Sequence, residues 1–276
     1  MLSGIGPSDD LKSVGITPIV DLADVGQHLT DQPLISTYWL VNSNITLDDF
    51  SRDKDLAAEA LAQWQANKTG VYTNTLSEGI AFLRIPDDSP IFQTAQDPSA
   101  GLGSGHFEMI VRNGFTVTDT EKLPATGHFV TISLSVVSPS SRGSIRLNSS
   151  NPFDFPVINP NFFNTTFDQF AMLFAVNASR AFMETPPWQG FVGDRFGVVG
   201  NATTEDEILQ GVKDSVGTIW HPVGTARMSP KSASWGVLDP QLLVKGTSGL
   251  RVVDASAFVS ILVYFSRFHE LTRRHS

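Results

Sequence analysis

Residues 129–137 alternate between apolar and hydroxyl-bearing side chains, and this period of two constrains the fold more than any other segment. The sequence Phe-Val-Thr-Ile-Ser-Leu-Ser-Val-Val is typical of a half-buried strand with one polar face. After a turn at residues 138–143, residues 144–147 continue the alternation, which predicts that the two segments pair as an antiparallel hairpin. An antiparallel sheet leaves one face available for a covering layer.

Three segments have the spacing of helices and could supply that layer. Residues 56–65 place their apolar side chains on one face, and residues 168–184 repeat Phe and Leu at helical spacing before Pro186. The third helix is expected after Thr204, which precedes Glu207 by three residues and so forms a capping box. The sequence therefore predicts an α+β fold, an antiparallel sheet covered by helices.

Composition excludes several classes of function. The 19 basic and 28 acidic residues give a net charge of −9, which argues against a nucleic-acid partner because phosphate binding needs a basic face. The chain has no cysteine, so disulfide scaffolds, thiolate metal sites and cysteine nucleophiles are excluded. Paired-histidine metal spacing is also absent, and no apolar stretch is long enough to span a membrane.

Asn-x-Ser/Thr triplets are unusually frequent, which indicates a secretory history. They occur at six positions: Asn44, Asn67, Asn148, Asn164, Asn177 and Asn201. At the Ser and Thr content of this chain, chance would give roughly two such triplets, and their free occurrence in loops rich in Ser and Thr remains the alternative explanation. The first residues, Met-Leu-Ser-Gly-Ile-Gly-Pro, lack the basic and apolar regions of a signal peptide. On balance we expect an extracellular protein.

One of the six histidines has a setting suited to chemistry. His221 follows Trp220 and precedes Pro222, and Gly224 comes two residues later. Proline stiffens the backbone after the imidazole, glycine permits close backbone approach to a flat ligand, and the indole could exclude water. An imidazole in this position can accept a proton from a substrate hydroxyl. The alternative is a structural histidine at a strand end, satisfied by a carbonyl group.

Other catalytic motifs are missing. The chain has no G-x-S-x-G nucleophile motif. The glycine-rich residues 101–105, Gly-Leu-Gly-Ser-Gly, lack both the last glycine of a dinucleotide fingerprint and a preceding strand.

Residues 218–240 and their continuation through residues 244–256 resemble the C-terminal signature of the glucose–methanol–choline (GMC) flavin oxidoreductases. Their core is Trp-His-Pro-Val-Gly-Thr-Ala-Arg-Met, followed later by Val-Val-Asp-Ala-Ser. Residues 138–160 and residues 2–33, the latter with Asp-Gln-Pro at its end, are similar to further segments of that family. Within it, the fungal aryl-alcohol oxidases are the most similar branch. The resemblance runs in order through nearly all of residues 1–257.

The resemblance implies a function and a set of site residues. FAD would be the cofactor, His221 would take the alcohol proton while a hydride passes to flavin N5, and Trp220 would face the substrate. Phe115 is similar to an aromatic residue of a gating loop, and Asp254 with Ala255 matches a strand end that approaches the ribityl and pyrophosphate portion of FAD. The alternatives are that Trp220 and Phe115 are core aromatics and that Asp254 caps a following helix.

The resemblance also implies a domain organisation. Residues 1–35 and 216–276 would be segments of a Rossmann-like FAD domain, and residues 36–215 the substrate domain. The G-x-G-x-x-G unit of the family is absent, so we expect a truncated form with negligible activity and very weak FAD affinity. The family's second active-site residue would fall near Phe265, and His269 lies too late in the sequence to take its role.

The functional expectation is therefore an FAD-dependent alcohol oxidase that converts a primary, aromatic or unsaturated alcohol to an aldehyde and reduces oxygen to hydrogen peroxide. Two alternatives remain: a quinone-dependent dehydrogenase of the same family, and a secreted glycoprotein or binding domain without enzymatic activity. The expected partners are a small alcohol and oxygen or a quinone, with no nucleic acid and no membrane.

Overall fold

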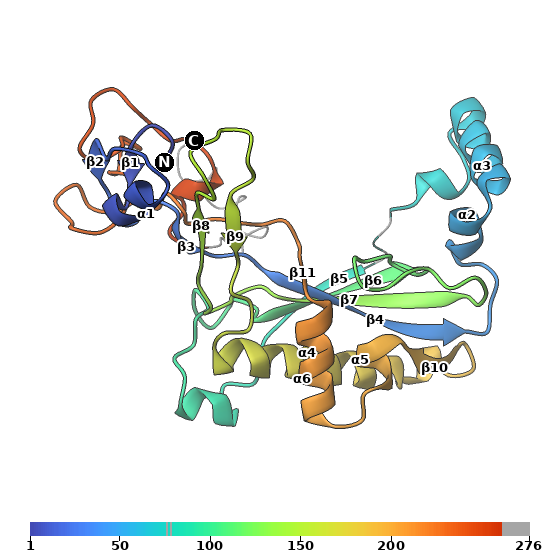
Figure 1. The fold of residues 1–276 in the computed structure, drawn as a ribbon. Helices are drawn as coiled ribbons and strands as arrows, with labels where there is room; N and C mark the ends of the chain where they lie inside the picture. Colours follow the sequence, from blue (N-terminus) through green and yellow to red (C-terminus); the bar gives the residue numbers. More distant parts are fainter. Residues whose placement is uncertain (76, 78, 261–276) are drawn as a thin grey trace, which may run out of the picture. The chain divides into compact units, whose positions relative to one another are not determined.

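The structure, a computed structural model, describes residues 1–75, 77 and 79–260 (Figure 1). The chain divides into two compact units, each built from separate segments. Unit 1 contains residues 1–32, 138–168 and 218–276, and unit 2 contains residues 33–137 and 169–217. Residues 138–168 therefore lie in one unit with both ends of the chain, whereas the sequence analysis placed them within the central domain. Among the described residues, no helix combines the length and apolar character needed to cross a bilayer.

Unit 2 is built on an antiparallel sheet with strand order β10-β4-β7-β6-β5. The strands are β10 (Val192–Phe196), β4 (Pro33–Val41), β7 (Phe129–Val136), β6 (Phe107–Asn113) and β5 (Gly79–Leu83). A further short strand, β11 (Gly217–Thr218), pairs with β4. The α+β prediction of an antiparallel sheet with covering helices is confirmed.

Helices cover one face of this sheet, as Figure 1 shows for α4 (Thr166–Met183), α5 (Gly197–Asn201) and α6 (Glu205–Ser215). The covered face is apolar: Ile132, Leu134 and Val136 of β7 are fully buried, and Phe107 meets Phe174 of α4 edge to face at 5.8 Å between ring centroids. Burial of this apolar surface is the main stabilising contribution to the unit. At the start of α6, the predicted capping box between Thr204 and Glu207 is present.

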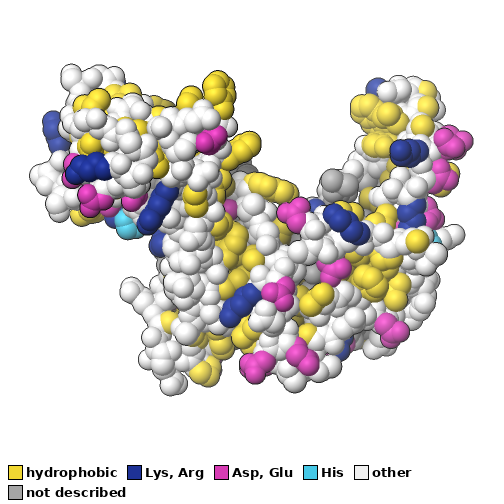
Figure 2. Space-filling model, in the orientation of Figure 1, with side chains coloured by type: hydrophobic (Ala, Val, Ile, Leu, Met, Phe, Trp, Pro, Cys, Tyr) yellow, Lys and Arg dark blue, Asp and Glu magenta, His cyan; other side chains and the backbone are white. Residues whose placement is uncertain are grey.

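The remaining helices of unit 2 are α2 (Asp48–Arg52), α3 (Lys54–Asn67) and the short η1 (Val71–Thr73), η2 (Pro90–Gln93) and η3 (Pro186–Trp188). Helix α3 confirms the helix predicted at residues 56–65, but only its Ala60 is buried. Leu56, Leu61 and Trp64 are at least 36% exposed, and Figure 2 shows hydrophobic side chains gathered on the surface over this helix.

The hairpin predicted for residues 129–147 is wrong. Strand β7 pairs with β4 and β6, whereas β8 (Gly143–Arg146) belongs to unit 1 and pairs with β3 (Gln27–Leu29) and β9 (Val157–Asn159). Asp168 fixes the segment between β7 and β8. Its carboxylate accepts hydrogen bonds from the backbone N–H groups of Ser140 and Ser141 at 2.7 and 2.9 Å. A carboxylate satisfied by two amides fixes the chain direction after β7 and prevents the hairpin.

Unit 1 contains a short β1-α1-β2 segment and the sheet β3-β8-β9. The segment consists of β1 (Ile5–Gly6), α1 (Ser8–Ser13) and β2 (Val20–Asp21), with β1 and β2 parallel. The unit also contains η4 (Ala255–Ala257). Its apolar core includes Val237, Leu238, Val244 and Ala257, so the C-terminal loops carry much of the packing of this unit.

Candidate active site

Residues 30–32 and 218–223 lie side by side in unit 1 and form the frame of the site. Thr30 N–H donates to the carbonyl of Val223 at 3.0 Å and Val223 N–H donates back to Thr30 at 2.8 Å. Ile219 N–H donates to the carbonyl of Gln32 at 3.2 Å. Backbone hydrogen bonds at both ends therefore fix the intervening Trp220 and His221 against the residues just before β4.

The carboxylate of Asp31 organises this frame. It is 7% exposed and accepts hydrogen bonds from the backbone N–H groups of His221 at 3.1 Å and Gln32 at 2.9 Å. It also accepts a hydrogen bond from the hydroxyl group of Thr218. The Thr218 oxygen in turn accepts a hydrogen bond from Trp220 N–H at 2.7 Å. Beyond Thr218 the chain makes a tight turn, which is shaped by one buried carboxylate.

The imidazole of His221 has a defined tautomer. Its Nδ1 lies 2.7 Å from Oε1 of Gln32, and an amide oxygen only accepts hydrogen bonds. Nδ1 therefore carries a proton, and in the neutral imidazole the lone pair is on Nε2. Gln32 is 4% exposed, whereas His221 is exposed. The buried amide of Gln32 therefore orients the imidazole of an exposed histidine. The role of His221 as the acceptor of the alcohol proton stays a prediction.

Trp220 presents its indole ring to solvent, and 78% of the residue is exposed. Its φ is 61°, a left-handed conformation that is unfavourable for a bulky residue and that concentrates at ligand-binding sites. The alternative that Trp220 is a core aromatic is wrong for this structure. Its role in facing the substrate stays a prediction.

Gly224 has a different reason for being glycine than the one predicted. Its φ is +93°, and a Cβ at this position would lie 2.5 Å from the carbonyl oxygen of His28. Glycine is required here by close approach to the backbone of unit 1 itself, so the interpretation of Gly224 as an approach point for a ligand is not needed.

Asp254 and Ala255 lie beside an apolar groove of the same unit. The Asp254 carboxylate accepts from Ser256 N–H at 2.8 Å and caps η4, as the structural alternative predicted. The groove measures about 520 Å³ and is lined by Met228, Pro240, Leu242, Val253, Asp254, Ala255, Ala257 and Phe258. Both predicted cofactor-binding residues therefore border a concave surface with room for part of a ligand.

Phe115 lies in unit 2, within an aromatic cluster. It is 9% exposed, stacks on Tyr38 at 4.2 Å between ring centroids and meets Phe129 edge to face at 5.2 Å. Burial raises the pKa of Tyr38 to about 12. The residue also borders a cavity of about 160 Å³. Phe115 is thus a core aromatic in this structure, and its gating role stays a prediction.

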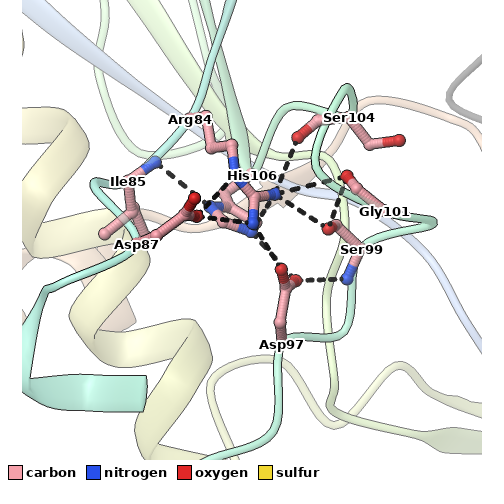
Figure 3. A network of polar contacts seen from close by, with 8 residues as sticks. All are labelled: Arg84, Ile85, Asp87, Asp97, Ser99, Gly101, Ser104 and His106. Atoms are coloured by element: carbon pink, nitrogen blue, oxygen red, sulfur yellow. Dashed lines mark hydrogen bonds and ion pairs between the residues drawn. The ribbon is translucent and has the colours of Figure 1, made fainter.

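A second polar network in unit 2 was not predicted from the sequence (Figure 3). His106 is fully buried; its Nδ1 accepts from Ile85 N–H at 3.1 Å and its Nε2 lies 3.0 Å from Asp97. Arg84 donates to Asp97 at 2.6 Å. Burial alone would raise the pKa of Asp97, but hydrogen bonds from Ser99 and Arg84 outweigh it and hold that pKa well below its usual range. The network therefore ties residues 84–106 together as a structural clamp.

The clamp predicts a pH dependence of stability. Burial lowers the pKa of His106 despite the opposing effect of Asp97, so the unfolded chain binds a proton more readily than the folded one. Stability should then fall as the pH drops below about 6.5, the unfolded value. We expect the free energy of unfolding, measured by urea unfolding, to be smaller at pH 5 than at pH 7. In His106→Gln, whose side chain does not titrate, this part of the loss should disappear; an unchanged loss would contradict the assignment.

Comparisons with known proteins agree with the geometry. The C-terminal sequence model of the GMC oxidoreductases matches residues 139–267. Dehydrogenase eriK of Hericium erinaceus is 34% identical over 94% of this chain and 44% of its own length. Pyranose dehydrogenase of Agaricus xanthodermus is 31% identical over 93% of this chain and 43% of its own. The chain thus spans less than half of the length of these curated relatives.

Solved structures lead to the same group. Formate oxidase of Aspergillus oryzae superimposes with a TM-score of 0.85 at 31% identity, over 94% of this chain and 48% of that one. A fungal aryl-alcohol oxidase shares the fold, with a TM-score of 0.71 at 22% identity over 94% of this chain and 48% of that one. The fold is the one that these oxidoreductases share. Residues 139–267 carry the C-terminal domain of the GMC oxidoreductases, and the chain is similar to members of that family over 94% of its length.

FAD is the cofactor of this family, and the residues present fit part of it. The groove beside Asp254 and Ala255 offers an apolar wall, and the small side chain of Ala255 leaves room for a flat ring. A pyrophosphate needs backbone N–H groups at a glycine turn; the described residues contain no G-x-G-x-x-G turn. Asp254 and Ala255 border this groove, and their expected place beside the ribityl and pyrophosphate portion of FAD stays a prediction. Phe265 and His269, considered above as partners of His221, lie outside the described residues.

The sequence analysis missed Asp31, Gln32 and Thr218 as supports of His221. The signal was present, because the Asp-Gln-Pro segment was one of the stretches similar to the family. The sequence does not show that this segment hydrogen-bonds with residues far later in the chain. The Asp31–His221 pair, for example, is separated by 190 positions.

The role of Gln32 can be tested through pH dependence. In Gln32→Glu, a carboxylate replaces the amide beside Nδ1 and favours the imidazolium form, which cannot accept a proton. We expect the acidic limb of the pH profile of kcat/KM for alcohol oxidation to move to higher pH by about one pH unit. Gln241→Glu, on an exposed loop of the same unit, is the matched control. An unmoved profile in Gln32→Glu would show that Gln32 does not govern His221.

Proposed function

We propose that the protein oxidises a primary alcohol to an aldehyde, with His221 as the base that accepts the hydroxyl proton. The observation that carries this proposal is the 2.7 Å contact between His221 Nδ1 and Gln32 Oε1, which leaves Nε2 unprotonated. The names of relatives support the class of reaction: an alcohol dehydrogenase of Pseudomonas putida is 29% identical and choline oxidase of Arthrobacter globiformis is 30% identical.

In this reaction the chain's own residues manage the proton. Nε2 of His221 takes the hydroxyl proton as the carbinol C–H bond breaks, and the Gln32 oxygen holds the opposite N–H and stabilises the imidazolium that forms. Asp31 keeps the backbone of His221 in place and so limits the movement of the ring. FAD, if bound beside Asp254 and Ala255, would supply the two-electron acceptor that the carbinol hydride requires. The alcohol thus loses one proton and one hydride and becomes the aldehyde.

For the substrate and acceptor we propose an aryl or otherwise unsaturated primary alcohol and molecular oxygen, which is reduced to hydrogen peroxide. The exposed indole of Trp220 beside His221 supports an aromatic substrate, because aromatic rings pair favourably in offset or edge-to-face geometry. A second candidate, a dehydrogenase that uses a quinone, is supported by the names of several relatives, which are dehydrogenases.

The experiment uses the protein with FAD in excess. Anaerobic mixing with benzyl alcohol should bleach the flavin absorbance, and subsequent mixing with oxygen or with benzoquinone in a stopped-flow instrument should restore it. Faster recovery with oxygen, together with stoichiometric hydrogen peroxide, supports the oxidase; faster recovery with benzoquinone supports the dehydrogenase. Flavin that stays oxidised with every primary alcohol tested would refute alcohol oxidation.

We also expect weak binding of FAD by the 276-residue chain, because it offers no glycine turn for the pyrophosphate. Equilibrium dialysis should give a dissociation constant of about 1 μM or higher. This value corresponds to a binding free energy no more favourable than about −8 kcal/mol. Purified chain that retains stoichiometric flavin would contradict this expectation.

An extracellular location remains part of the proposal. All six asparagines of the Asn-x-Ser/Thr triplets are exposed, including Asn177 on helix α4, and exposure is what an attached glycan requires. Treatment of the secreted protein with an N-glycosidase should lower its apparent mass.

A further inference from the structure

Strand β5 forms one edge of the unit 2 sheet and carries exposed side chains on both of its faces. It pairs with β6 on one side (Figure 1), and no other strand in the described part of the chain pairs with it. On one face, Ile80 is 57% and Phe82 is 51% exposed. On the other face, Leu83 is 37% exposed and Ala81 is also exposed. The outer side of β5 therefore presents apolar side chains and backbone groups that lack a partner strand.

Such an edge is unusual, because native sheets protect their edges. A row of free N–H and C=O groups can pair with a strand of another chain, and charged side chains, prolines, bulges or short strands usually prevent this. The five residues of β5, Gly-Ile-Ala-Phe-Leu, include neither a charged residue nor a proline. Their register with β6 runs without a bulge from the Gly79–Val111 pair to the Leu83–Phe107 pair.

The other sheet edges carry these protective features. At the opposite side of unit 2, β10 contains Asp194 and Arg195, and its register with β4 shifts between Val192 and Arg195. In unit 1, β9 is three residues long and lies between Pro156 and Pro160. Strand β3 is equally short, and its register with β8 also shifts. Among the described residues, β5 is therefore the only edge strand of more than three residues that lacks protection.

The sequence of β5 is self-complementary about Ala81. When two copies of the strand pair antiparallel across a two-fold axis at Ala81, each Ile80 lies opposite Phe82 of the second copy. Each Gly79 then lies opposite Leu83 of the second copy. A β-branched side chain opposite an aromatic one is a favourable cross-strand pair, and the two-fold axis produces this pair twice. No like charges meet within the paired strands, so a second copy of the chain fits this edge.

We propose that two copies of the chain associate through β5, edge to edge and antiparallel, so that their unit 2 sheets join into one continuous sheet. The interface is isologous, because the same strand of each copy supplies the N–H and C=O groups. Pairing uses up the free edge of both copies, so association stops at two. The paired edge is short, and small interfaces are typical of weak, concentration-dependent association. The proposal rests on unit 2 alone and is independent of the oxidation at His221.

Sedimentation equilibrium of the 276-residue chain without FAD measures this association. As the concentration rises through the micromolar range, the mass should increase from 30.0 kDa towards twice that value and no further. Hydrogen exchange at residues 79–83 should be slower in concentrated than in dilute protein, because outward N–H groups become hydrogen-bonded. A chain that stays monomeric at every concentration would overturn the proposal and assign the edge to a strand of a different protein. Growth beyond two copies would also overturn it.

Paired charge variants at Ala81 test the register. In Ala81→Lys two ammonium groups would face each other across the two-fold axis, and in Ala81→Glu two carboxylates would do so, which destabilises the pairing. Each variant alone should be monomeric at concentrations at which the unmodified chain is dimeric. An equal mixture of the two variants should recover the dimer, because the facing charges are then opposite.

Ala58→Lys, on the exposed surface of α3, is the matched control and should dimerise like the unmodified chain. Since Ala81 is exposed, its variants should keep the fold, which circular dichroism checks. A dimer that persists in Ala81→Lys, or a mixture of folded variants that stays monomeric, would overturn the proposal.

Discussion

Replacing His221 by alanine should lower the rate of alcohol oxidation by about 10²- to 10⁴-fold, the usual contribution of a general base. The reason is geometric: the exposed Nε2 is unprotonated because Nδ1 donates to Gln32 at 2.7 Å, and alanine leaves no group to take the hydroxyl proton. The bleaching rate of the flavin on anaerobic mixing with alcohol measures this step directly. FAD affinity should change little, since His221 does not line the groove beside Asp254.

His28→Asn is the matched control for this experiment. His28 lies in the same unit, pairs with Asp24 and has a φ of 61°, a conformation that asparagine tolerates well. The rate of the control should stay within about threefold of the original rate, because His28 takes no part in the reaction. A threefold change corresponds to about 0.7 kcal/mol in the activation free energy. If His221→Ala oxidises alcohol as fast as this control, the imidazole is not the base.

The largest effect on stability is expected at Asp48 of unit 2. Its carboxylate is 1% exposed and accepts from the backbone N–H groups of Phe115 at 2.7 Å and Phe129 at 2.8 Å. It also accepts from the hydroxyl of Thr46 at 2.8 Å. Asp48→Ala would leave these donors buried and unpaired, so we expect a loss of about 3–5 kcal/mol in the free energy of unfolding.

Urea unfolding followed by tryptophan fluorescence tests this expectation, and Asp49→Ala on the same helix is its control. The Asp49 side chain is 47% exposed and pairs with Arg52 at 3.2 Å, and such a surface ion pair contributes at most about 1 kcal/mol. Equal losses in the two variants would show that burial of the Asp48 carboxylate is not what stabilises the loop before β7.

Local signals in the sequence predicted local structure well. The Thr204–Glu207 capping box and the helical spacing around Phe170 and Phe174 are present in α6 and α4, because caps and amphipathic faces depend on neighbours within a few residues. The prediction of a hairpin after β7 was wrong because Asp168 fixes the direction of the chain there. Asp168 lies 28 residues from Ser140, to which it is hydrogen-bonded. A contact at that separation leaves no trace in residue spacing.

The candidate site was predicted in part for the same reason. His221 stands out through its neighbours Trp220 and Pro222, and the structure gives it an unprotonated, exposed nitrogen. Its tautomer depends on Gln32, whose separation from it is 189 residues. The polar residues of β7 illustrate the opposite error: period two correctly predicted a strand, but it cannot tell a face in water from a buried face that is polar.

The discontinuity of the two units has a consequence for anyone who manipulates the gene. The chain passes between the units after residues 32, 137, 168 and 217, so no single cut yields either unit intact. The side chains of Asp31 and Thr218 hydrogen-bond to each other. Asp31 lies just before the first of these crossing points in the sequence, and Thr218 lies just after the last. A circular permutation or an inserted tag near either point would therefore disturb the base itself, while residues 150–155, exposed in unit 1, offer a safer place to open the chain.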